Sequence, residues 1–177
     1  MSRFEDLVQL RRSHRQFTPE TVSREDRERI LRAALMSPTS KNRRDWQFIT
    51  VENRETLDAL AGAKPTGAAF LAGAPLCIVV LGNAAGNDCW VEDCSIAVTS
   101  MLYQAQELGL GACWIQLKGR PHKEGGTVSA GDYVRSLLGV PDGLEVLCLV
   151  AVGRPADERQ PQNEDKLLWT SVHHEIF

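Results

Sequence analysis

Apolar residues along this 177-residue chain follow two patterns, helical spacing and short continuous runs. Apolar positions three and four apart, each set preceded by a helix-capping residue, predict five helices. Apolar runs bounded by turn residues predict four strands. The helices are expected to begin near Ser2, Ser23, Asn53, Asp93 and Ser129, and the strands to span Trp46–Val51, Leu76–Leu81, Ala112–Leu117 and Glu145–Gly153.

The order of these elements is two helices, then strands separated by helices, then a tail. Alternation of strands and helices predicts a parallel α/β sheet. The helix from about Asp93 to Leu108 is apolar on most sides, so we expect it at the centre of the core. Gly109 is expected to end that helix in the left-handed conformation.

The tail, residues 154–177, fits this picture poorly. A polar stretch over 159–166 is followed by apolar residues, which are Leu167, Leu168, Trp169, Val172, Ile176 and Phe177. A small monomer would leave much of that surface in water, and a large exposed apolar surface is typical of an interface. The tail therefore predicts a partner chain.

Length and composition predict one compact globular domain over residues 1–177. A net charge of −3 argues against general nucleic-acid binding, which needs many cationic contacts to phosphate. The longest apolar runs, Leu76–Leu81 and Val146–Val152, are far shorter than the roughly 20 residues that span a bilayer. The first residues include acidic side chains and no apolar stretch of signal-peptide length. We expect a cytoplasmic protein.

The cysteines and histidines predict neither a disulfide framework nor a metal site. Five cysteines cannot all pair within one chain, and Cys77, Cys113 and Cys148 lie in apolar runs where cysteine acts as a buried hydrophobe. No zinc-finger or HExxH spacing is present. Cys89 and Cys94 are either ordinary thiols or a redox pair.

Glycine patterns exclude several common nucleotide sites. The stretch that begins at Gly109 leads from a helix into a strand, the reverse of the dinucleotide fingerprint, and has Trp114 where the third glycine belongs. No phosphate-binding lysine completes a P-loop, and there is no GxSxG motif. A Rossmann-type nicotinamide site is therefore not expected.

The densest positive charge lies in residues 11–15, Arg11-Arg12-Ser13-His14-Arg15. One interpretation is a set of cations at a helix C-terminus, where each stabilises the helix by about 0.3–1 kcal/mol. The other is a phosphate site, because guanidinium groups and a hydroxyl donate charge-assisted hydrogen bonds to phosphate. A second polar loop over 37–44 is either a solvated turn or part of the same site.

Taken together, four motifs resemble the nitroreductase family of FMN enzymes over essentially the whole chain, most closely its short members. They are RRSHRQF, SPTSKNRRDWQFITV, ELGLGACWI and VAVGRPA, in that order. The resemblance implies an α+β fold with a mostly antiparallel sheet flanked by helices, in contrast to the parallel sheet above. It also implies an intertwined homodimer whose C-terminal arm, about 154–177, crosses to the partner, with two FMN sites at the interface.

The resemblance assigns flavin contacts by position. Arg11 would hold the phosphate with help from Ser13, and Arg15 would lie near the ribityl chain and the pyrimidine edge. The partner subunit would supply the loop that contains Asn42, and the backbone at the end of the third strand would line the ring near N5. The full set of cofactor-binding residues is Arg11, Arg12, Ser13, Arg15, Pro38, Thr39, Ser40, Asn42, Trp114, Ile115, Gln116, Gly153, Arg154 and Lys166.

Three positions depart from the family pattern. Many members have Asn-x-Gln-Pro-Trp where this chain has Asn42-Arg43-Arg44-Asp45-Trp46, which changes the loop near the substrate mouth. A family asparagine falls near Gly67, and Asp165 replaces a common arginine, which leaves Lys166 to supply the charge. We interpret these differences as changes in substrate preference and flavin affinity.

The resemblance implies an FMN-dependent oxidoreductase that uses NADH or NADPH to reduce nitroaromatics, quinones or similar electrophiles by a ping-pong cycle. The flavin N5 carries the chemistry, so no catalytic side chain and no metal is expected. Two alternatives stay open. One is a specialised flavoenzyme that acts on one metabolite, and the other is a flavin- or nucleotide-binding protein without turnover.

Overall fold

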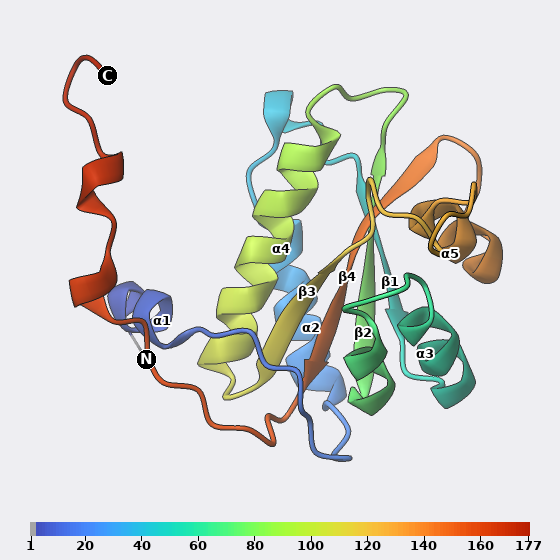
Figure 1. Cartoon of the computed structure of the whole chain (residues 1–177), viewed down its shortest axis with the longest axis horizontal. Coiled ribbons are helices and arrows are strands. Elements are labelled where there is room, and N and C mark those ends of the chain that lie inside the picture. Colours follow the sequence, from blue (N-terminus) through green and yellow to red (C-terminus); the bar gives the residue numbers. More distant parts are fainter. Residues whose placement is uncertain (1–2) are drawn as a thin grey trace.

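The structure is a computed structural model that describes residues 3–177. Figure 1 shows a twisted sheet with helices on both faces, and it shows helix α1 and the C-terminal tail at the same side of the molecule. The helices are α1 (Phe4–Leu10), α2 (Arg24–Leu35), α3 (Arg54–Ala61), α4 (Trp90–Glu107) and α5 (Ala130–Leu138). The strands are β1 (Trp46–Val51), β2 (Leu76–Asn83), β3 (Gly111–Gln116) and β4 (Leu144–Gly153).

The sheet has the strand order β1-β2-β4-β3, and every neighbouring pair is antiparallel. This confirms the α+β fold that the resemblance implied, and the parallel sheet expected from the pattern is wrong. The reason is the position of β4. Strands β2 and β3 run in the same direction with α4 as their crossover, but β4 inserts between them in the opposite direction. Alternation along a sequence does not reveal such an insertion.

Apolar side chains fill both sides of the sheet. Helices α2 and α4 pack on one face around Ile78, Val80 and Val150, and α3 and α5 pack on the other around Val79 and Leu149. Strand β2 is buried over nearly its whole length, which explains its unbroken apolar sequence. The long helix α4 lies on the core as expected, although Ile96 on its outer side is exposed.

The predicted helix ends are mostly correct. Ser23, Asn53 and Ser129 each accept a hydrogen bond from a backbone N–H of the first turn of the helix that follows. Gly109 ends α4 in the left-handed conformation, with φ +71°. Helix α4 begins at Trp90, slightly before the expected start. The predicted cap of the first helix, Ser2, lies outside the described residues. At the beginning of α1, the Arg3 N–H donates a hydrogen bond to the Asp6 carboxylate.

Helix α1 and the tail, about 154–177, which we call the two ends of the chain, lie at the same side of the molecule and away from the sheet (Figure 1). The tail contacts α1 through the Gln162 N–H, which donates to the Gln9 carbonyl at 2.8 Å. Apolar side chains of both segments remain exposed, among them Phe4 of α1 and Trp169 of the tail. Within residues 3–177, no helix combines the length and the apolar character that a membrane crossing requires.

Candidate functional site

Strand β3 forms one edge of the sheet, so half of its backbone groups face away from β4. The Ala112 carbonyl is one of them, because it accepts a hydrogen bond from the His14 N–H at 3.2 Å. Residues alternate in an antiparallel pair, so Trp114 and Gln116 also point their N–H and C=O groups outward. The strand thereby presents a short row of hydrogen-bonding groups to whatever lies beside it.

The arginine-rich segment crosses the start of this edge. Ser13 forms a parallel bridge with Ala112, and a Cβ atom at Gly111 would lie only 2.8 Å from the Cβ of His14. Glycine at this position therefore allows the segment to lie directly on β3. Gly153, at the end of β4, has a similar packing role, because a Cβ there would lie 2.6 Å from Pro75 Cδ.

His14 joins this segment to the beginning of the tail. Its Nδ1 lies 2.8 Å from Asp157 Oδ1, and both side chains are largely buried. Burial on its own raises the pKa of Asp157, but the hydrogen bond and the charge of His14, together with Arg159, outweigh it, and the pKa is lowered. No role for His14 was predicted from the sequence. Its contacts with Asp157 and Ala112 make it the anchor of the arginine-rich segment.

Three cations and a hydroxyl gather around one thiol. Burial raises the pKa of Cys113, while the charges of Arg15, Arg11 and Lys64 and a hydrogen bond from Ser13 act against it. Within residues 3–177, neither Arg11 nor Arg15 forms an ion pair with a carboxylate. We call Arg11, Ser13 and Arg15 the arginine corner; Lys64 lies near it, on the connection before β2. The arginine corner combines unpaired positive charge with the outward edge of β3.

Phe70 orients one member of the arginine corner. The Arg15 guanidinium lies 5.8 Å from the centre of the Phe70 ring, a cation–π arrangement. Neither Phe70 nor Lys64 was predicted from the sequence. Both lie in the glycine- and alanine-rich connection before β2, where an isolated cation or aromatic residue gives no pattern.

Other predicted residues lie elsewhere. The Arg12 guanidinium donates to the carbonyls of Gln160 and Pro161 in the tail, and Arg154 pairs with Glu20. Lys166 is exposed in the tail. The side chain of Ile115 is buried in the core, so this residue offers only its backbone. Within one copy, the structure therefore brings Arg11, Ser13 and Arg15 to the β3 edge. The side chains of Arg12, Arg154, Lys166 and Ile115 lie away from that edge.

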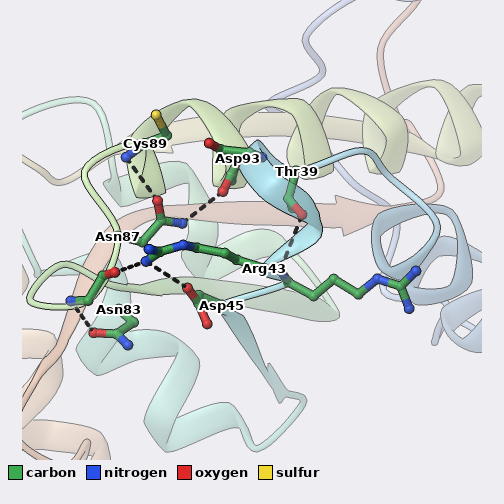
Figure 2. A network of polar contacts seen from close by, with 10 residues as sticks. Thr39, Arg43, Asp45, Asn83, Asn87, Cys89 and Asp93 are labelled. Atoms are coloured by element: carbon green, nitrogen blue, oxygen red, sulfur yellow. Dashed lines mark hydrogen bonds and ion pairs between the residues drawn. The ribbon is translucent and has the colours of Figure 1, made fainter.

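The second predicted segment is a loop over 38–45 that is fixed to the beginning of α4. The Ser40 N–H donates to Asp93 Oδ1 at 2.8 Å, and Asn87 Nδ2 donates to Asp93 Oδ2 at the same distance. Arg43 contacts the Gly86 carbonyl, as Figure 2 shows. Asp93 and Asn87 are buried, and the sequence analysis identified neither as an anchor for this loop.

The loop and the arginine corner lie at opposite ends of α4 (Figure 1). Helix α4 has 18 residues, so its ends are about 27 Å apart. Thr39, Ser40 and Asn42 therefore lie far from the arginine corner of their own chain. Pro38 is nearer the middle of α4, because it follows Ser37, whose hydroxyl donates to the Ser100 hydroxyl at 2.7 Å. Lys41, Asn42 and Arg44 adopt positive φ angles of 52°, 53° and 57°, a conformation that is unfavourable for residues other than glycine.

The thiols and histidines form no metal site among residues 3–177, because no three potential ligands are grouped there. All five cysteines are free, and Cys77, Cys113 and Cys148 are buried as predicted. Burial, followed by the nearby Asp93 charge, raises the pKa of Cys94 to about 12. This thiol therefore stays protonated and unreactive at neutral pH.

Comparison with known proteins agrees with the motifs. The family model described as the Nitroreductase family matches residues 8–66 and 62–154. An Archaeoglobus fulgidus protein, named as a candidate NADH dehydrogenase/NAD(P)H nitroreductase, is 32% identical over 96% of this chain and 95% of its own length.

Solved structures show the same similarity. An FMN-dependent nitroreductase from Clostridium difficile R20291 is 38% identical with a TM-score of 0.93, over 97% of this chain and 98% of that one. A candidate NADH dehydrogenase/NAD(P)H nitroreductase from Parabacteroides distasonis is 30% identical with a TM-score of 0.89, over the full length of both chains. The protein described above belongs to the nitroreductase family.

Proposed function

We propose that the protein is an FMN-dependent oxidoreductase that takes electrons from NADH or NADPH and passes them to nitroaromatics, quinones or similar electrophiles. One observation carries this proposal. Arg11 and Arg15, which pair with no carboxylate among residues 3–177, belong to the segment that lies on the outward edge of β3. The names of the relatives support it, since one is an FMN-dependent nitroreductase and another names NAD(P)H. Electron donor and acceptor would use the same site in turn, a ping-pong cycle.

The residues of the arginine corner fit FMN. Arg11 and Ser13 would hold the phosphate, because a guanidinium and a hydroxyl are matched donors for phosphate oxygens. The planar ring would lie along β3, where the outward N–H groups of Trp114 and Gln116 can donate hydrogen bonds to it. When bound, FMN supplies the transfer of hydride and electrons, so no acid–base pair is required of the side chains.

The protein's own part is to position the ring and to supply positive charge. Arg15, held against the Phe70 ring, would place its charge beside the flavin ring and would favour reduction of the flavin. Cys113 stays a neutral thiol because burial raises its pKa, so it does not cancel that charge. Gly153 and Arg154 would form the rim, and Arg12 and Lys166 would act through the tail.

We also propose that the working form is a homodimer, with a single domain and an arm, about 154–177, that crosses to the partner. Two features support it: the exposed apolar residues of the tail, and the distance between residues 39–42 and the arginine corner of the same chain. Pro38, Thr39, Ser40 and Asn42 would then approach the partner's flavin. The five free thiols suit a reducing compartment, which favours the cytoplasm.

A specialised relative that acts on one metabolite is the second candidate. The Arg43 side chain is fixed by the Gly86 carbonyl and lies 4.0 Å from Asp45. A loop with this ion pair presents a different surface from the family's proline-containing one, which supports a narrower choice of substrate.

The visible absorption spectrum of the purified protein, followed by anaerobic titration with NADH and NADPH, tests the proposed function. We expect the wild type to be yellow and to be bleached by at least one donor. The Arg15→Glu variant should be folded and colourless, because a carboxylate beside the ring and phosphate repels them. Arg32→Glu, the same change on the exposed side of α2, is the control and should stay yellow.

Normal flavin content in Arg15→Glu would remove this residue from the site. A wild-type flavin that stays oxidised with both donors would indicate a binding protein without turnover. Sustained NAD(P)H consumption with menadione or a nitrofuran would support the enzyme.

A further inference from the structure

A pocket of about 540 Å³ lies next to the last residue of β3. One wall is the segment Lys64–Gly67, and the other is the loop after β3, with Arg120 and Glu124. Gln116 lines the same pocket. The pocket is therefore continuous with the strand edge along which we place the flavin.

Specific contacts hold its two walls in place. His122 Nδ1 donates to the Ala63 carbonyl at 3.0 Å, which joins the loop after β3 to the residue before Lys64. The His122 ring stacks on Tyr133 with centres 3.9 Å apart, and the Tyr133 hydroxyl donates to the Ala59 carbonyl at 3.2 Å. Because α3 and α5 both anchor it, the pocket is preformed.

The pocket concentrates positive charge that has no partner. Lys64 and Arg120 both line it, and Glu124 is the one carboxylate among its lining residues. Within residues 3–177, none of the three takes part in an ion pair. Burial lowers the pKa of Lys64, and the charge of Arg120 lowers it further. Two like charges held near each other favour an anion that can neutralise them.

Lys64 lies over the backbone at Gly67. A Cβ added there would be in ordinary contact with Lys64 Nζ, at 3.7 Å, and glycine is favoured instead by its φ of +76°. This is the position near which the family asparagine was expected from the sequence. Where the resemblance implies a neutral amide, the chain has an ammonium group over the backbone.

We propose that this pocket is an anion subsite, which binds the carboxylate or phosphate group of a substrate while the reacting part of that substrate lies at the β3 edge. The inference rests on the proposed function and narrows it to substrates that carry an anionic group. Arg120 offers a forked donor and Lys64 a point charge, a pairing suited to carboxylate or phosphate oxygens. The anionic group belongs either to the electron acceptor or to the nicotinamide donor.

Calorimetry on the FMN-loaded protein tests the subsite without turnover. The probes are benzoate and its uncharged analogue benzamide, neither of which is a nitro compound or quinone. We expect benzoate to bind about tenfold more tightly, since each of the two partly exposed cations should strengthen binding of the anion about threefold. This preference should weaken between about 20 and 500 mM salt, because salt screens exposed charges.

Matched variants show which residues cause the preference for benzoate over benzamide. Lys64→Met and Arg120→Met should each weaken benzoate binding about threefold and leave benzamide unchanged. Glu124→Gln should tighten benzoate binding. Lys123→Met, on the same loop but not lining the pocket, is the control and should behave as the wild type.

Steady-state kinetics identify the source of the anion. If the acceptor supplies it, the two Met variants raise KM for 4-nitrobenzoate but not for 4-nitrobenzyl alcohol. If the donor supplies it, they raise KM for NADH and NADPH but not for 1-benzyl-1,4-dihydronicotinamide, which has no phosphate. Either result supports the subsite.

Three results would overturn the subsite: an FMN-loaded, active wild type that binds benzoate no better than benzamide, a preference that salt does not change, or Met variants with the wild-type preference. If Lys64→Met loses FMN but keeps the wild-type preference for benzoate over benzamide, Lys64 binds the cofactor and not the substrate anion. A wild type that holds no FMN and oxidises no NAD(P)H refutes the proposed function itself, so the two failures are distinguishable.

Discussion

The sheet with its helices and the two ends of the chain contain the same kinds of apolar side chain but treat them in opposite ways. Ile78 and Leu149 are completely buried, whereas Trp169 is 72% exposed and Ile176 81% exposed. The core is therefore complete within one copy. The ends have an apolar surface that this copy does not cover, and the proposed homodimer rests on that difference.

Polar contacts hold the exposed parts of the chain in place. The tail is tied by His14 to Asp157 and by Arg12 to backbone carbonyls, and the loop 38–45 is tied to Asp93 and Gly86. Burial of apolar area is additive and large, whereas each hydrogen bond contributes only about 1 kcal/mol. Substitutions in the two kinds of region should therefore differ in the size of their effect on stability and in how that effect depends on protein concentration.

The largest effect is expected in the core. Ile78→Ala removes apolar atoms from a fully buried position and should lower the free energy of unfolding by about 2–5 kcal/mol. Urea denaturation measures it. Since the lost contacts lie within one copy, the loss should be the same at low and high protein concentration; a loss that disappears at high concentration would contradict the comparison.

The next effect concerns the tail and rests on the proposed homodimer. Trp169→Ala should raise the dimer dissociation constant at least roughly 30-fold, because a buried interface Trp is often worth about 2 kcal/mol. Analytical ultracentrifugation measures it. Leu137→Ala, an apolar truncation of an exposed residue on α5, is the control and should leave association unchanged. An unchanged constant for Trp169→Ala would leave the exposed tail without a partner.

Much of the fold could be predicted because its signals are local. Ser23, Asn53 and Ser129 bind N–H groups a few residues away, and Gly109 ends α4 through its own φ angle. The insertion of β4 between β2 and β3 could not be predicted from these local signals, because strand pairing depends on contacts between residues far apart in the sequence. Only the resemblance to a family supplied that information.

The third effect is smaller and depends on pH. Asp157→Asn removes the charge that binds His14 and should lower the free energy of unfolding at pH 7 by about 1–2 kcal/mol. The pKa of Asp157 is lower in the folded chain than in the unfolded one, so the unfolded chain binds more protons. The stabilisation is therefore complete above the ordinary carboxyl pKa of about 4 and is lost as the pH falls through the lower, folded value.

Thermal unfolding between pH 7 and pH 2 measures this dependence. Below about pH 4 the unfolding temperature of the wild type should approach that of Asp157→Asn, so that the two plots of unfolding temperature against pH converge. Asp142→Asn is the control, because this carboxylate is fully exposed and lies 3.3 Å from Arg135, outside the ends of the chain. A constant difference across the whole range would show that the loss is one of packing.

The candidate site was only partly predictable for a related reason. Arg11, Ser13 and Arg15 are adjacent in the sequence, so their cluster was visible. Lys64 and Phe70 approach it from a separate connection, and Asp93 reaches the loop at Ser40 from another helix. Single residues that meet only after folding leave no spacing to recognise. The structure was needed to find them.

The smallest effect tests whether the loop 38–45 is strained. Lys41 has φ 52° and ψ 23°, the left-handed region that costs a residue with a Cβ about 1–2 kcal/mol. Lys41→Gly removes that cost and adds the entropy of a glycine, so the free energy of unfolding should rise by about 0.5–1 kcal/mol. Ser40→Gly, at a neighbour without positive φ, should lower it by a similar amount. The midpoint of urea denaturation measures both, and equal losses in the two variants would show that polar contacts hold this loop without backbone strain.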